Sequence, residues 1–159
     1  MEGLSPLQEK LGEVLGLALA APVVIAKVEQ RADDPRFAEM RAEAAEIRAR
    51  CGAIAECWGE QRWDVLTHAD FVEQKAGELA AAWFKASTDA VQAYEFLAMA
   101  EAGELAATLA LGALNRGGSR AIEELVAFAH PVQQRHLNAA LEGCARHAAG
   151  ALAEAEPVA

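Results

Sequence analysis

The stretch of sequence that decides the fold covers residues 89–152 and reads DAVQAYEFLAMAEAGELAATLALGALNRGGSRAIEELVAFAHPVQQRHLNAALEGCARHAAGAL. We expect two long helices in it, over residues 89–115 and 119–152, because apolar residues recur at spacings of three and four on both sides of a short polar segment. Asp89 and Ser119 are placed to cap the two helices at their starts, and Gly117 can end the first one in a left-handed conformation. The stretch therefore predicts a helical hairpin.

A second hairpin is predicted in the N-terminal part of the chain. Ser5 precedes Pro6, and Asp34 precedes Pro35, which is the cap-plus-proline pattern of a helix start. These starts predict helices over residues 6–31 and 35–62. A shorter helix over residues 68–86 would connect the two hairpins, and at about 1.5 Å per residue it spans roughly 28 Å. The sequence thus predicts a single all-α domain over residues 1–159, a four-helix bundle of two antiparallel hairpins with one long, partly helical crossover.

Composition and charge narrow the classes of partner. The chain has 159 residues, of which 53% are hydrophobic, and its formal net charge is −10. Such an acidic chain gains nothing electrostatically from nucleic acid or from an anionic membrane surface, so we expect neither as a partner. The apolar run over residues 14–26 is shorter than a membrane span requires. Three cysteines cannot all close into intrachain disulfides, which favours a cytoplasmic location.

A few polar residues are predicted to lie inside the bundle. Glu101 and Glu104 interrupt an otherwise apolar face of the helix over residues 89–115. In an antiparallel hairpin folded about Gly117, Glu101 comes level with Gln133, and Glu104 comes level with His130. His136 lies about one turn from Glu101. Because burying a carboxylate is costly unless it is paired, we expect these side chains to form one internal cluster.

The helix order and two stretches resemble the ferritin-like superfamily. Residues 94–104 (YEFLAMAEAGE) and 130–136 (HPVQQRH) are similar to its third and fourth helices. The resemblance implies a site for two iron or manganese ions, held by a Glu from each of two helices and a Glu-x-x-His from each of the other two. This sequence contains no Glu-x-x-His, and Gln133-x-x-His136 is its nearest remnant. A complete two-metal site is therefore not expected.

Three interpretations of the cluster stay open at this point. The first is a metal-free internal polar network. The second is a single transition metal ion, which could be iron, manganese or zinc. Its candidate ligands are Glu101, Glu104, His130, Gln133 and His136. The third is a ligand pocket formed where small side chains replace the lost metal site.

Two functions of different classes follow. One is a ferritin-like protein with a partial or altered metal site, redox-active or metal-handling. The alternative is a metal-free ferritin-like scaffold or interaction protein that acts as a homodimer. The dimer is predicted because the helix over residues 6–31 is apolar nearly all round, and Gly12 and Gly16 allow another helix to approach it closely.

Overall fold

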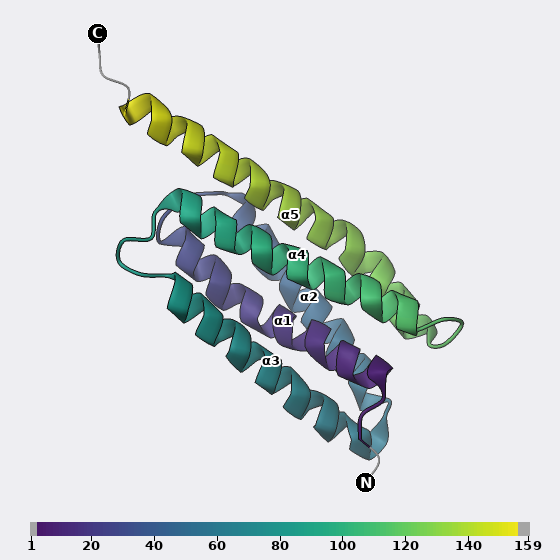
Figure 1. The fold of residues 1–159 in the computed structure, drawn as a ribbon. Helices are drawn as coiled ribbons and strands as arrows, with labels where there is room; N and C mark the ends of the chain where they lie inside the picture. The colour runs from purple at the N-terminus through teal and green to yellow at the C-terminus, as the bar shows by residue number, and fades with distance from the viewer. Residues whose placement is uncertain (1–2, 156–159) are drawn as a thin grey trace.

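Figure 1 shows the computed structural model of the chain, which describes residues 3–155. This part of the chain contains five α-helices and no β-strand, so the prediction of an all-α fold is confirmed. The helices are α1 (Pro6–Glu29), α2 (Arg36–Glu56), α3 (Arg62–Trp83), α4 (Ala90–Leu114) and α5 (Arg120–Ala155). A short 3-10 turn, Gly59–Gln61, lies between α2 and α3.

The junction between α2 and α3 differs most from the predicted boundaries. The prediction continued the second helix to residue 62 and began the next at residue 68, but α2 ends at Glu56 and α3 begins at Arg62. The reason is Gly59, whose φ of 58° is left-handed and cannot continue an α-helix.

The helix caps elsewhere follow the predicted chemistry. The Ser5 and Asp89 side chains accept hydrogen bonds from the backbone of Gln8 and Gln92, and both glutamine side chains bond back to complete a capping box. The helix predicted over residues 119–152 is continuous, because α5 runs through Pro131 to Ala155.

The first helix lies at the centre of the arrangement. It packs against α2, α3 and α4, while α5 packs against α4 and α2. The close approach to α3 depends on Gly16, since a Cβ atom there would collide with the Ala69 carbonyl oxygen and with Val72. Gly12 and Gly16, which were predicted to allow a helix of a second subunit to approach, are thus covered by α3 of the same chain. The homodimer itself stays a prediction.

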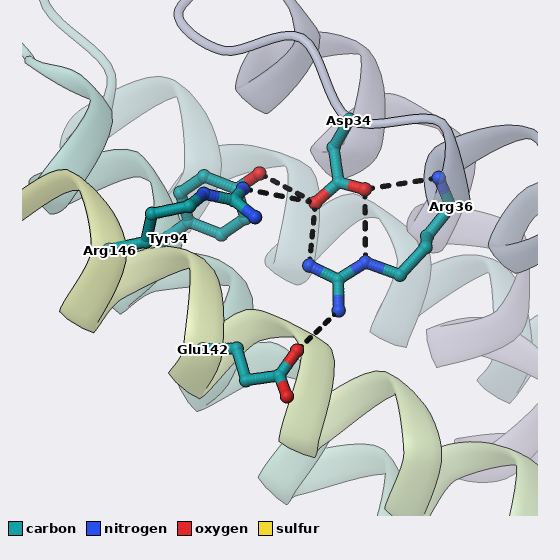
Figure 2. Close-up of polar contacts among 5 residues, drawn as sticks. All are labelled: Asp34, Arg36, Tyr94, Glu142 and Arg146. Atoms are coloured by element: carbon teal, nitrogen blue, oxygen red, sulfur yellow. Dashed lines mark hydrogen bonds and ion pairs between the residues drawn. The ribbon is translucent and has the colours of Figure 1, made fainter.

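A polar cluster fastens the connection between α1 and α2 to the C-terminal hairpin (Figure 2). Arg36 donates to both carboxylate oxygens of Asp34, from Nε at 3.0 Å and from Nη2 at 2.9 Å. Tyr94 Oη donates to Oδ2 at 2.9 Å, and Arg146 lies 3.7 Å from the same oxygen. Arg36 also reaches Glu142 at 2.6 Å. The hydrogen bonds from Arg36 hold the pKa of Asp34 well below its usual range.

Two helices are long and apolar enough to cross a membrane by length and composition, α1 and α4. The run over residues 14–26 is part of a 24-residue helix, so the argument that it is too short for a span was wrong. A core helix of a soluble protein meets the same two criteria. The absence of a membrane partner therefore stays a prediction, as does the cytoplasmic location.

Candidate functional site: a buried acidic cluster beside an apolar groove

Four of the five predicted site residues are buried along the contact between α4 and α5. Glu101 and Glu104 lie one helical turn apart on α4, and Gln133 and His136 lie one turn apart on α5; each is at most 7% exposed. His130 is exposed and has no carboxylate within 4 Å among residues 3–155. The structure therefore does not bring His130 into the cluster, because it falls on the outer face of α5.

His136 lies between two carboxylates. Its Nδ1 is 3.4 Å from Glu101 Oε2, and its Nε2 is 3.5 Å from Glu43 Oε1. Glu43 comes from α2, and its other carboxylate oxygen accepts a 2.6 Å hydrogen bond from Arg135. Glu43 and His136 also line a polar hollow between α2 and α5 with a volume of about 350 Å³. The cluster thus extends from α4 through α5 to α2.

The participation of Glu43 was missed in the sequence. Glu43 lies among charged residues at helical spacings, which is typical of a solvated, salt-bridged face. Its side chain is nevertheless only 16% exposed. The signal was its position three residues after Met40 and four before Ile47, both of which belong to the apolar seam of α2. A residue in that position lies at the edge of the seam and can reach inward.

The arrangement around His136 does not converge on one metal ion. Its two ring nitrogens point away from each other, and each faces a different carboxylate, so one ion cannot be shared by both carboxylates and the ring. Among residues 3–155, no three His, Cys, Asp or Glu side chains are grouped to hold a metal. The polar interior leaves buried atoms without a hydrogen bond, namely Glu101 Oε2, Thr108 Oγ1, Gln133 Oε1 and His136 Nε2. The binding of one iron, manganese or zinc ion therefore stays a prediction.

Within residues 3–155, neither Gln133 nor Tyr94 hydrogen-bonds to Glu101, and Tyr94 donates to Asp34 instead. The polar neighbour of Glu101 in this part of the chain is His136, whose Nδ1 lies 3.4 Å from Glu101 Oε2.

Glu104 faces a different direction from Glu101. Its carboxyl is among the residues that line an apolar groove between α1, α3 and α4, and no side chain of residues 3–155 hydrogen-bonds to it. Burial, together with the negative charge of Glu101, raises the pKa of Glu104 well above its usual value. The protonated form of Glu104 is therefore favoured over that of an ordinary glutamate, and the residue lies at the groove.

The groove has a volume of about 600 Å³, and Glu104 is the single titratable residue in its lining. Small residues form much of its wall, and large apolar side chains form its rim. The rim residues Leu79 and Met99 are 66% and 53% exposed. Leu79 and Trp83 of α3 both lie at this groove. Its lining consists of Leu17, Ala20, Ala21, Val24, Ala76, Leu79, Ala82, Trp83, Phe96, Met99, Ala100, Gly103 and Glu104.

Comparison with known proteins adds no family to this description. No protein-family model, curated protein or solved structure matches the chain. The resemblance to ferritin-like proteins therefore rests on the order of the helices and on the residues of α4 and α5 described above.

Proposed function

We propose that this chain is a binding protein that holds a small apolar molecule in the groove between α1, α3 and α4. The observation that supports this proposal is the combination of an apolar lining with one buried, unpartnered carboxyl, that of Glu104. Small-molecule sites are typically concave and apolar, occupy about 300–1,000 Å³, and contain a few polar groups that orient the ligand. The groove has these properties.

The exposed rim supports the same proposal. The exposed apolar side chains of Leu79, Trp83 and Met99 are clustered around one opening. Exposed apolar residues are more often scattered singly over a protein surface. A ligand that enters the groove would remove this surface from water. Burial of apolar area contributes roughly 25 cal/mol per Å² before the costs of binding are subtracted.

We propose a ferritin-like arrangement for the helices around this site. The contacts of α1 with α2, α2 with α5, α5 with α4, and α4 with α1 support it, with α3 as a further helix beside α1. In that arrangement α1 contributes no carboxylate to the centre. The groove lies beside the four helices, between α1, α4 and the further helix α3, where Ala20, Ala21, Ala100 and Gly103 leave space. It is therefore a pocket next to the altered metal site, whose place is taken by the cluster of Glu43, Glu101 and His136.

The proposal is tested by filling the groove. A Cβ atom at Gly103 meets no atom within 4 Å, so Gly103→Leu can place its side chain in the groove without displacing the backbone. We expect the wild-type protein to bind the neutral probe N-phenyl-1-naphthylamine saturably at one site, and Gly103→Leu to weaken this binding at least tenfold. Gly52→Leu is the matched control, because Gly52 also has open space around its Cβ position but lies on α2.

Other outcomes would contradict the proposal. Absence of saturable binding, or equal binding by both leucine variants, would exclude the groove as a small-molecule site. A dimer in light scattering that dissociates in Gly103→Leu would show that a second copy of the chain occupies the groove. That result would favour the alternative function, the homodimeric scaffold.

A further inference from the structure

The Glu104 carboxyl in the otherwise apolar groove indicates the chemistry of the polar end of the ligand. We propose that this end is a positively charged amino group that pairs with the Glu104 carboxylate, so that the ligand class is an apolar amine. The inference rests on the proposed function, because it concerns the same groove.

The first argument is the isolation of Glu104. The residue is 7% exposed and lines the groove, and no side chain of residues 3–155 hydrogen-bonds to it. Its oxygens are not among the fully buried polar atoms without a partner, so they remain open to the groove. Buried carboxyl groups in proteins are normally hydrogen-bonded or paired with a cation. A group that enters through the groove can supply the missing partner, and no rearrangement of the helices is needed.

The second argument is the charge of the surroundings. Glu101 lies one turn away on α4 and adds a negative charge. On α5 the nearest titratable group is His136, but it is already placed between Glu101 and Glu43 of α2. The residues that α1 and α3 contribute to the groove are all apolar. No cation of the described chain therefore faces Glu104.

The same surroundings disfavour the other classes of amphiphile. A carboxylate or phosphate head would approach Glu104 without a lysine, arginine or histidine in the lining. A hydroxyl or carbonyl head would gain one hydrogen bond, which water at the open side of the groove supplies as well. A cation gains an ion pair with Glu104, and the net charge of −10 attracts it from a distance.

The pairing has a definite proton balance. Burial and the negative charge of Glu101 raise the pKa of Glu104, which favours a proton on its carboxyl in the empty groove. When an ammonium group binds to the protonated carboxyl, the carboxyl O–H bond breaks, the proton leaves to solvent, and the ammonium keeps all of its own protons. Amine binding thus releases up to one proton, whereas binding of an alcohol releases none.

The test compares three ligands with the same twelve-carbon chain: dodecylamine, dodecanol and dodecanoate, each below its aggregation concentration at pH 7. Their affinities are measured by displacement of N-phenyl-1-naphthylamine, and proton release is measured by calorimetry in two buffers of different ionisation enthalpy. We expect dodecylamine to bind at least ten times more tightly than dodecanol, and dodecanoate to bind more weakly than dodecanol. Amine binding should release up to one proton.

A pair of variants distinguishes the effect of Glu104 in the groove from the effect of the overall negative charge of the chain. Glu104→Gln should lower the affinity for dodecylamine to that for dodecanol and leave dodecanol binding unchanged, which also shows that the variant is folded. Glu95→Gln removes the same charge from an exposed position on α4 and should leave all three affinities unchanged.

The outcomes distinguish the inference from the proposed function. If dodecanol binds in the groove but dodecylamine has no advantage, or if Glu104→Gln does not change amine binding, the inference is wrong and the proposed function stands. If none of the three ligands displaces a bound probe, the inference is also wrong; if the probe itself does not bind saturably, the proposed function fails and the inference fails with it.

Discussion

Tyr94 and Asp34, sixty residues apart in the chain, meet through a 2.9 Å hydrogen bond from the tyrosine hydroxyl to the carboxylate. The bond joins the connection between α1 and α2 to the beginning of α4 (Figure 2). The Asp34 side chain is only 2% exposed, and Arg36 neutralises it. Burial, more than the bond to Asp34, raises the pKa of Tyr94 to about 12, so the hydroxyl remains a donor throughout the physiological range.

Replacement of Asp34 should lower the free energy of unfolding and also make that free energy less dependent on pH in acid. Because the pKa of Asp34 is lowered in the folded state, its contribution to stability is present above its unfolded pKa of about 3.9 and is lost as the pH falls through the lower folded value. We expect Asp34→Asn to reduce the free energy of unfolding at pH 7 by about 2–3 kcal/mol, since it loses charge-assisted hydrogen bonds. Urea unfolding from pH 7 to acid measures both effects, with exposed Asp33→Asn as the neutral control.

The ring of Tyr94 leaves no room for a side chain on the facing helix. A Cβ atom at Gly143 would overlap the ring, so we expect Gly143→Ala to displace Tyr94 and to destabilise the protein by about 1–3 kcal/mol. Gly150→Ala on the same helix has open space and should instead be neutral or stabilising by up to roughly 1 kcal/mol, because alanine favours the helix. Equal thermal shifts for the two variants would contradict the packing seen around Tyr94.

Glu104 should destabilise the folded protein at neutral pH. Its folded pKa is raised, so its contribution is most favourable below the unfolded pKa of about 4.3 and is lost as the pH rises through the folded value. Glu104→Gln has no carboxyl to ionise, so its stability does not fall in this way as the pH rises. We expect the variant to be more stable than wild type by about 1–3 kcal/mol at pH 7. The difference should shrink towards pH 4 in denaturant titrations. A variant less stable than wild type at pH 7 would show that Glu104 has a partner in the folded state.

The contact between α1 and α3 should be sensitive to a single methyl group. Gly16→Ala forces the Ala69 carbonyl and Val72 away from α1, and we expect a loss of about 1–3 kcal/mol in the free energy of unfolding. Gly77→Ala, whose Cβ position on α3 is open, serves as the control and should not destabilise the protein. If Gly16→Ala is as stable as the control, the two helices are farther apart than described.

Metal binding can be decided by elemental analysis and titration with iron, manganese and zinc. Since the ring nitrogens of His136 face two separate carboxylates, we expect less than about a tenth of an equivalent of metal in protein prepared without chelators. Stoichiometric uptake that disappears in Glu101→Gln would establish the metal site predicted from the sequence. It would also require His136 to turn away from one of its present neighbours.

The helices could be predicted because local signals determine them. The caps at Ser5 and Asp89 and the three-four spacing of apolar residues depend on a few neighbours along the chain. The placement of α3 could not be predicted, because the contact of Gly16 with Val72 depends on how two distant segments approach each other. The same applies to the site: the inward position of Glu101 followed from its helix face, but its meeting with His136 and the reach of Glu43 depend on three helices together.

The narrow attachment of α3 has a consequence for motion. Only Val65, Ala69 and Ala80 of its residues are fully buried, and the helix packs chiefly against α1, with the left-handed Gly59 at its entrance. Segments with few buried contacts open at a lower free energy than the global unfolding transition. The backbone amides of α3 should therefore exchange with deuterated solvent before those of α4. Because α3 forms one wall of the groove, this local opening would also be the route by which a bulky ligand enters and leaves.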